Sequence, residues 1–304
     1  MTKRTVPGIA GSKRRDGADP LVMVTAYDAP SSRVATEADV DMILVGDSVA
    51  MVVLGYDSTL QVTVEDIAYH TAAVVRSDPT AVVVGDLPWM SFHVSPTETV
   101  NNAATLVRAG AHCVKLEGGA KRLPMIEAIT AAEIPVVAHI GLTPQSTNVM
   151  GGFKIQGRQA DAAQLMIDDA RRLASAGCFA IVIEGVPDVV GQRVTEAIDI
   201  PTIGIGAGPD TDGQVLVYHD IIGLENRFKP RFVRRYGQAY DDQVSALTAY
   251  AADVRTGAFP GPDEVYSASD ELTEALGLYG SGPAADSEAT GPAPTATPTT
   301  QPTP

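Results

Sequence analysis

The stretch MILVGDS, residues 42–48, is an apolar run that ends on a carboxylate and a hydroxyl. Its first four residues suit a strand buried on both faces, as in a parallel sheet. AVVVGDLP, residues 81–88, has the same form, and its Asp86 stands where Asp47 stands in the first stretch. Because a lone carboxylate is costly to bury, the repeated acid after Val-Gly predicts that these strands end at a functional site rather than in the core.

Apolar, β-branched runs recur eight times along the chain. They lie at residues 21–28, 42–48, 81–88, 113–119, 134–142, 179–186, 201–208 and 214–220. Stretches with helical spacing separate most of them, so strand and helix alternate. Eight such units in about 240 residues predict a (β/α)8 TIM barrel. The gap after residue 208 is too short for a full helix before the eighth strand.

A doubly wound parallel sheet is the alternative fold. Its glycine-rich phosphate turn would follow the first strand, where this chain reads TAYDAP. GIGAG at 204–208 has GxGxG spacing, but it follows the seventh run without a helix start of the dinucleotide-binding kind. We interpret it as a tight turn at a strand end.

Composition divides the chain into three parts. Residues 1–20 form an N-terminal segment, residues 21–260 form the barrel with a closing helix at 241–257, and residues 261–304 form a C-terminal extension. From about residue 279 the extension is rich in Pro, Thr, Ala and Gly. Such a segment has little to bury, which predicts disorder.

Charge and hydropathy exclude several classes of function. The formal net charge of −15 argues against general nucleic-acid binding, which needs clustered Lys and Arg. No apolar run reaches the roughly 18 residues that cross a bilayer, and the basic N-terminus has no apolar stretch behind it. We therefore expect a soluble, unexported protein.

The cysteines and the basic residues indicate the surroundings of the protein. Cys113 and Cys178 lie inside apolar runs, where they suit small core residues in a reducing cytoplasm. The chain has 6 Lys against 16 Arg within an acidic composition. That balance hints at a halophile with a cytosol of high salt, where charge repulsion is screened.

Polar residues end five of the eight runs, at the mouth where barrel enzymes hold their active sites. These residues are Asp47, Asp86, Lys115 with Glu117, His139, and Glu184. Residues two apart on a strand share a face. Lys115 and Glu117 therefore point the same way, either as a plain salt bridge or as part of a binding site.

Asp47, Asp86 and Glu117 offer the oxygen ligands that Mg²⁺ prefers, although each Asp could instead cap a turn. His139 is as consistent with a buried, hydrogen-bonded histidine as with a catalytic one. Glu184 ends the apolar run FAIVIE. We interpret it as a general base that moves a proton.

These residues lie within motifs of a known family. The chain resembles 3-methyl-2-oxobutanoate hydroxymethyltransferases, also called ketopantoate hydroxymethyltransferases, over about residues 21–260. The matching motifs are TAYD, LVGDS, GYDSTLQVTVEDIAYHTAAV, DLPWM, NAATLVRAGAHCVKLEGG, HIGLTPQS, GGFKIQGR, GIGAGPDTDGQVLVYHD and FPGPDEVY.

The resemblance implies a TIM barrel of the phosphoenolpyruvate/pyruvate superfamily that depends on Mg²⁺. It implies transfer of a one-carbon unit from 5,10-methylenetetrahydrofolate, or a related pterin, to 3-methyl-2-oxobutanoate. The product would be 2-dehydropantoate, on the route to pantothenate and coenzyme A. Family members typically assemble as homodecamers.

The resemblance also implies roles for residues of this sequence. Asp47 and Asp86 would bind the metal, with Glu117 completing its surroundings, and Glu184 would be the proton acceptor. The keto acid would contact Asp47, Ser48, Asp86, Lys115 and His139. The long segment at residues 143–158 would form a lid or a loop on the folate side.

Two other functions remain open from the residues alone. A lyase of the isocitrate or methylisocitrate type also binds an oxo or hydroxy acid on Mg²⁺, but such enzymes rely on a loop cysteine in a KKCGH-like context, which this chain lacks. A non-catalytic barrel that binds a small acid is the second. It should lack the strand-end acids, which are present here.

Overall fold

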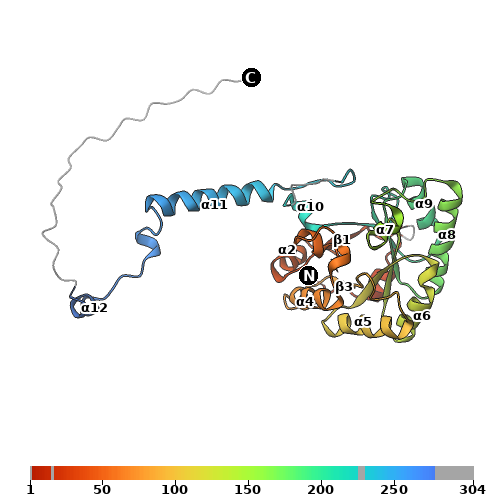
Figure 1. Ribbon diagram of the computed structural model, residues 1–304, viewed down its shortest axis with the longest axis horizontal. Helices are drawn as coiled ribbons and strands as arrows, with labels where there is room; N and C mark the ends of the chain where they lie inside the picture. Colours follow the sequence, from red (N-terminus) through yellow and green to blue (C-terminus); the bar gives the residue numbers. More distant parts are fainter. Residues whose placement is uncertain (1, 15–16, 225–229, 278–304) are drawn as a thin grey trace, which may run out of the picture. The chain divides into compact units, whose positions relative to one another are not determined.

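The eight apolar runs form eight parallel strands that close into a barrel in chain order (Figure 1). The computed structural model describes residues 2–14, 17–224 and 230–277. The strands are β1 Leu21–Thr25, β2 Met42–Val45, β3 Val82–Asp86, β4 Cys113–Glu117, β5 Val136–Gly141, β6 Ala180–Glu184, β7 Thr202–Ile205 and β8 Gly213–Leu216. Pairing of β1 with β8 completes the ring, so the barrel prediction is confirmed and the doubly wound sheet is wrong.

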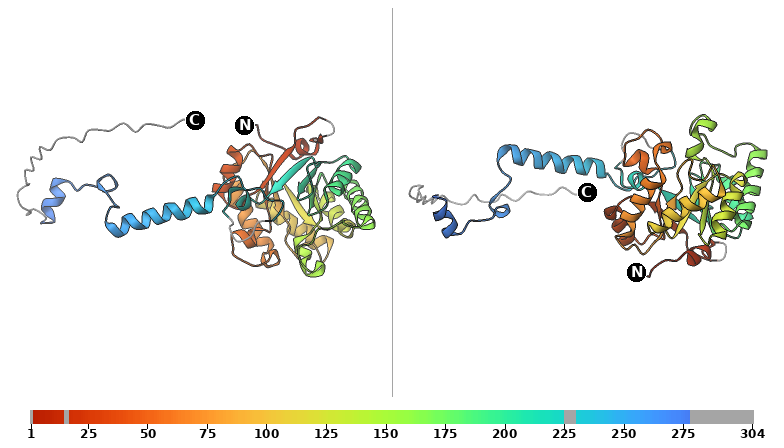
Figure 2. Two further views of the ribbon diagram at one scale, coloured as in Figure 1. Left: turned by 90° about the horizontal axis from the view of Figure 1, so that it is seen from above. Right: turned by 60° about the horizontal axis from the view of Figure 1, so that its bottom comes forward.

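Helices surround the strands on the outside, as both views in Figure 2 show. The main ones are α2 Ala29–Glu37, α4 Val64–Val75, α5 Pro96–Arg108, α6 Leu123–Ala131, α8 Ala160–Ser175 and α9 Asp188–Ala197. Asp28, Thr63 and Ser95 cap the first three by accepting a hydrogen bond from a main-chain N–H of the first turn.

The eighth unit differs from the others. Residues 206–212, between β7 and β8, contain no helix, as the short gap predicts. The run predicted as the eighth strand ends early, because the helix α10, Tyr218–Ile222, takes its last residues.

Side chains alternate between the interior of the barrel and its outer wall. Met42 and Leu44 of β2 belong to the interior cluster, whereas Ile43 and Val45 belong to the cluster beneath the helices. The same alternation, continued to the carboxyl ends of β3 and β4, directs their last polar residues inward. The fold thus gathers the strand-end residues inside one mouth.

The N-terminal segment closes the opposite end of the barrel. It carries the short helix α1, Val6–Ala10, whose Ile9 packs in the interior cluster beside Leu21 and Met42. Lys13 Nζ follows and lies 2.7 Å from Asp212 Oδ2, with both side chains buried. Lys13 also donates to the Thr195 carbonyl at 2.8 Å, so its charge is well satisfied.

Contacts divide the chain into two units, residues 1–245 and 246–304. The helix α11, Ala239–Thr256, spans that division and has no buried residue, and α12 covers Asp270–Ala275. The helix predicted at 241–257 is therefore present, and its role in closing the barrel stays a prediction. The disordered tail predicted from about residue 279 lies outside the described residues.

Within the part of the chain that the structure describes, no helix combines the length and the apolar character that crossing a bilayer requires.

Replacing Lys13 tests the closure of the barrel. We expect Lys13→Met to lower the free energy of unfolding by about 3–5 kcal/mol, because it leaves the carboxylate of Asp212 buried without its cation. Urea denaturation measures this. The matched control is Lys3→Met, since Lys3 pairs with Asp78 at 3.3 Å on the surface and should contribute under about 1 kcal/mol. Equal losses for the two variants would show that the buried pair is not special.

Candidate active site

All seven predicted site residues line one cavity of about 640 Å³ at the carboxyl ends of the strands. They are Asp47, Ser48, Asp86, Lys115, Glu117, His139 and Glu184. Strands β2 to β6 are consecutive neighbours in the barrel, and their register sets Asp86 beside Lys115 and Glu117 beside His139. A volume of this size falls in the range of small-molecule sites.

Asp47, just after β2, lies close to Asp86 at the end of the neighbouring strand β3. The main-chain N–H of Asp47 donates to Asp86 Oδ2 at 3.1 Å, and both side chains are buried. Burial, together with the charges of Asp86 and Glu117, raises the pKa of Asp47 well above its usual value. Burial also raises the pKa of Asp86 and outweighs the opposing effect of Lys115. The two carboxylates are therefore held close at an electrostatic cost that a cation would relieve.

Lys115 and Glu117 share the interior face of β4, as their spacing predicts, and both are buried. Lys115 Nζ pairs across the strands with Asp86 Oδ1 at 2.8 Å. Burial alone would lower the pKa of Lys115, but Asp86, Glu117 and Asp47 outweigh burial and raise it. Lys115 is thus a fixed positive charge in the wall of the cavity, and its partner is Asp86 rather than Glu117.

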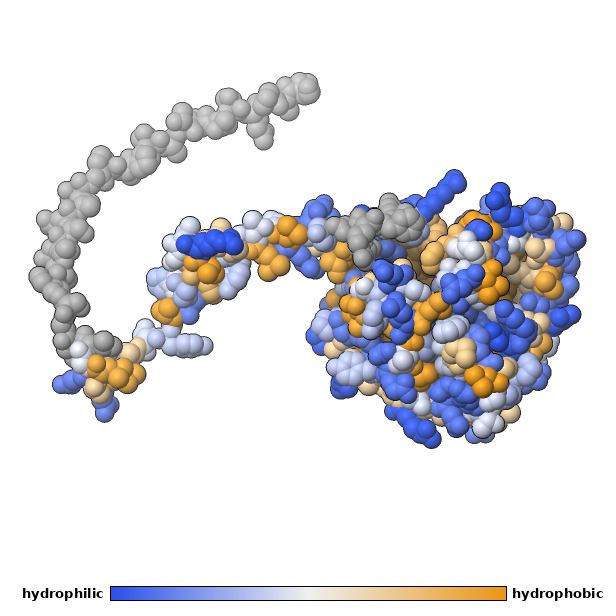
Figure 3. All heavy atoms as spheres, in the orientation of Figure 1, coloured by the Kyte–Doolittle hydropathy of each residue, from blue (hydrophilic) through white to orange (hydrophobic). Residues whose placement is uncertain are grey.

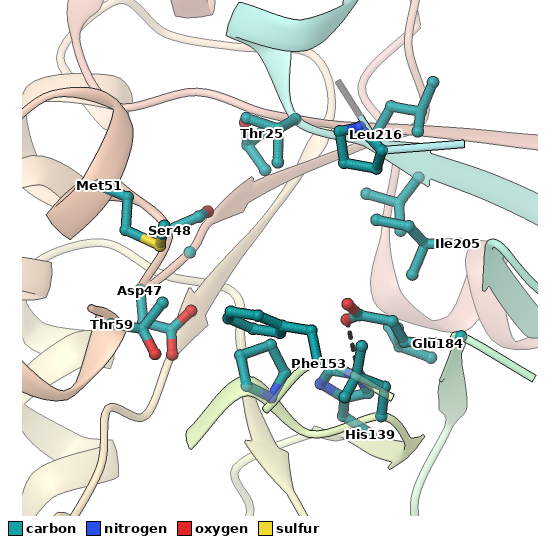
Figure 4. A pocket seen from close by; sticks show the side chains of 18 of the residues that line it. Thr25, Asp47, Ser48, Met51, Thr59, His139, Phe153, Glu184, Ile205 and Leu216 are labelled. Atoms are coloured by element: carbon teal, nitrogen blue, oxygen red, sulfur yellow. Dashed lines mark ion pairs between the residues drawn. The ribbon is translucent and has the colours of Figure 1, made fainter. Parts of the chain in front are cut away.

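His139 joins two carboxylates. Its Nε2 lies 3.2 Å from Glu184 Oε2 and its Nδ1 lies 3.5 Å from Glu117 Oε1; the dashed line in Figure 4 marks the pair with Glu184. Burial opposes protonation of His139, yet these carboxylates raise its pKa to about 9. With both ring nitrogens protonated, Nδ1 cannot accept from Lys115 Nζ, 3.4 Å away.

Glu184 ends β6 at the rim, and its side chain is 15% exposed. The neighbouring residue on β5 is Gly141, whose φ of +94° lies in the left-handed region. A Cβ at this position would collide with the main-chain oxygen of Glu184. Glycine therefore lets the two strands approach where the carboxylate leaves the sheet.

The charges of the cluster do not balance. Four carboxylates, on Asp47, Asp86, Glu117 and Glu184, face two cationic groups, on Lys115 and His139. Counted in their ionised forms, the carboxylates exceed the cationic groups by two charges, and the neighbouring carboxylates add to the effect of burial in raising the pKa of Asp47. Among the described residues no three His, Cys, Asp or Glu side chains surround a single metal position. The carboxylates of Asp47 and Asp86 nevertheless fit Mg²⁺, which takes one or two carboxylates and fills its other positions with water and substrate oxygens.

Two buried side chains that we did not predict complete the site. Tyr27 OH lies 2.8 Å from Ser48 Oγ, and burial raises the pKa of Tyr27, so its hydroxyl stays protonated. Gln145 donates from Nε2 to Asp47 Oδ2 at 3.0 Å. Both residues lie within the motifs TAYD and HIGLTPQS, but neither ends a strand, so strand-end logic alone does not select them.

The rest of the cavity wall is mainly apolar. Figure 4 shows Phe153 between Asp47 and the pair of Glu184 with His139, while Ile205 and Leu216 line another side. Phe153 belongs to the predicted loop at residues 143–158, which also contains the helix α7, Thr147–Met150. This loop thus faces the cavity, and its action as a lid stays a prediction.

Known proteins resemble this chain over most of its length. 3-Methyl-2-oxobutanoate hydroxymethyltransferase 2 of Bradyrhizobium diazoefficiens is 50% identical over 276 residues, which cover 91% of this chain and 94% of that protein. The 3-methyl-2-oxobutanoate hydroxymethyltransferase of Syntrophobacter fumaroxidans is 51% identical over 267 residues, covering 88% and 94%. These similarities confirm the resemblance that the motifs indicate.

A solved structure supports the fold. The crystal structure of 2,3-dimethylmalate lyase, a PEP mutase/isocitrate lyase superfamily member, matches 90% of this chain and 95% of its own with a TM-score of 0.55 and 16% identity. Similarity at that identity concerns the barrel alone. The family model described as ketopantoate hydroxymethyltransferase matches residues 3–262. The chain therefore belongs to the ketopantoate hydroxymethyltransferase family.

Proposed function

We propose that this chain transfers a one-carbon unit from 5,10-methylenetetrahydrofolate to 3-methyl-2-oxobutanoate. The product is 2-dehydropantoate, and the reaction serves pantothenate and coenzyme A biosynthesis. The family match and relatives that are about half identical support the activity. The observation that carries the mechanism is a group of buried carboxylates, on Asp47, Asp86 and Glu117, that shares one cavity with a rim carboxylate, Glu184.

The charge-deficient side of the cluster is the proposed site of Mg²⁺. Asp47 and Asp86 would hold the ion, with Glu117 alongside through water. Bound there, the ion supplies stabilisation for the negative charge that develops on the oxygens of the keto acid. Lys115 attracts the same acid with a fixed charge. Ser48, held by Tyr27 at 2.8 Å, offers a hydroxyl to it.

Glu184 is the proposed base. It takes the proton from C3 of the keto acid, and C3 then bonds to the one-carbon unit while tetrahydrofolate leaves and water supplies the hydroxyl oxygen. Its contact with His139, at 3.2 Å, fixes its direction, and as a base it would act in the carboxylate form. That form is the one that can accept a proton.

The donor would occupy the apolar part of the cavity. Phe153 is 63% exposed and lies on the cavity wall, so its ring is available to a flat, conjugated ligand. The same surface would accept tetrahydrofolate or a related pterin. The identity of the carrier is part of the proposal.

The lyase alternative needs a reactive cysteine in a loop. The chain has two cysteines, and both are buried within the barrel domain. Burial raises the pKa of Cys178 to about 12 and raises that of Cys113 further. Neither thiol lines the cavity, so cysteine-dependent lyase chemistry has no support in this chain.

We also propose that the chain self-associates, as a homodecamer. Helix α11 carries an apolar stripe at a spacing of four and three residues: Tyr240, Val244, Leu247, Ala251 and Val254. Figure 3 shows apolar side chains along this helix, and Leu247 is 68% exposed. A stripe with this period fits against another helix or a second copy of the chain.

We propose that the protein is cytoplasmic and that the cytosol of its organism is rich in salt. Two free cysteines are consistent with a reducing compartment. The acidic composition, with 16 Arg and 6 Lys, supports a cytosol of high salt.

Exchange in D₂O tests the activity. With 3-methyl-2-oxobutanoate and Mg²⁺ the enzyme should replace the C3 proton by deuterium, observed as loss of its NMR signal, and EDTA should stop the exchange. The reason is that proton removal needs both the base and the ion. A lyase would instead cleave hydroxy tricarboxylic acids, and a simple binding protein would leave the signal unchanged.

Replacing Glu184 tests the base. We expect Glu184→Gln to slow C3 exchange by at least about 100-fold, because the amide cannot accept the proton, while Mn²⁺ binding stays within a few-fold. Glu196→Gln on α9 is the matched control, since Glu196 pairs with Arg193 at 3.1 Å on the surface. Full exchange by Glu184→Gln would remove Glu184 from the mechanism.

A charge on α11 tests self-association. Leu247→Asp should reduce the mass measured by sedimentation, because a carboxylate cannot be buried in an apolar contact. Ala249→Asp is the control, since it lies about 200° round the helix from position 247 and should keep the wild-type mass. A monomeric wild type, or equal masses for all three proteins, would contradict the proposal.

A further inference from the structure

Gln145 connects three neighbouring strand ends. It lies in the single turn η4, Pro144–Ser146, directly after β5, and its side chain is buried. Its main-chain N–H donates to Glu117 Oε2 at 3.0 Å. Its Nε2 donates to Asp47 Oδ2 and to the Leu87 carbonyl, each at 3.0 Å. Gln145 thus contacts Asp47 just after β2, Glu117 at the end of β4 and the Leu87 carbonyl just after β3.

The chemistry of the amide fixes its direction. The NH₂ group has two hydrogens, and both meet acceptors, one on Asp47 and one on Leu87. A flipped amide would turn Oε1 toward the same carboxylate and carbonyl, so that acceptor would face acceptor in a buried site. The observed orientation is therefore strongly preferred.

The hydrogen bond acts on one oxygen of Asp47. By holding Oδ2, Gln145 removes the rotational freedom of the carboxylate before any ligand arrives. The main-chain bond restrains Glu117 in the same way. Both acids are thereby oriented in advance.

We propose that Gln145 is a positioning residue that holds Asp47 and Glu117 in the orientation that receives a divalent cation. This inference rests on the proposed function, because it concerns the same cation site. Gln145 also belongs to the loop that carries Phe153, so it ties that loop to the carboxylates. Supporting residues of this kind typically change metal affinity by 10- to 100-fold.

Titration with Mn²⁺, followed by electron paramagnetic resonance of the free ion, measures the affinity without substrate. Gln145→Met keeps the length of the side chain and removes its donors. Gln145→Asn keeps the amide one methylene short of its partners, and it supplies the test if the methionine variant does not fold. Gln164→Met is the matched control, because Gln164 donates to Asp168 at 3.1 Å on the surface of α8.

We expect both Gln145 variants to raise the Kd for Mn²⁺ by about 10- to 100-fold, while Gln164→Met matches the wild type. A purely structural role would lower the unfolding temperature of the metal-free protein and leave the Kd unchanged. Folded Gln145 variants whose Kd stays within twofold of the wild type would therefore overturn the inference.

The wild type separates this inference from the proposed function. If the wild type binds Mn²⁺ and exchanges the C3 proton while the variants bind equally well, the inference alone fails. If the wild type binds no Mn²⁺, the inference and the proposed cation site fail together.

Discussion

The central physical constraint in this protein is an excess of negative charge inside the mouth of the barrel. Four carboxylates face one lysine and one histidine there, and most of these side chains are buried. The closed ring of strands holds most of them in place, because strand register sets Asp86 beside Lys115 and Glu117 beside His139. Such a cluster favours a positively charged ligand, and that preference links the fold to the proposed chemistry.

Strand-end residues could be predicted from the sequence because two simple rules act together. An uninterrupted apolar run identifies a strand buried on both faces, and alternation fixes which of its last residues points inward. These rules place Asp86, Lys115, Glu117 and Glu184 correctly, all on the interior face. They cannot give the partners: Lys115 could have paired with Glu117, and the neighbouring strand instead brings Asp86 to 2.8 Å.

The parts that could not be predicted depend on loops and on contacts distant in sequence. Gln145 and Tyr27 reach the site from turns outside the strands, and no periodicity gives the direction of such side chains. The N-terminal segment lies outside the eight predicted strands, yet its helix α1 packs into the base of the barrel. Helix α11 can be predicted from its acidic start and the Gly that follows it, but its stripe of apolar residues does not identify the surface that covers it.

The buried pair of Lys13 and Asp212 has a consequence for biosynthesis. These residues are 199 positions apart. Strand β1 likewise cannot form its pairing with β8 until β8 has been synthesised. During synthesis on the ribosome, Lys13 emerges long before its carboxylate partner exists, so the growing chain cannot bury this charge favourably. The base of the barrel can therefore close only after nearly the whole domain has been translated. It cannot fold to completion step by step from the N-terminus.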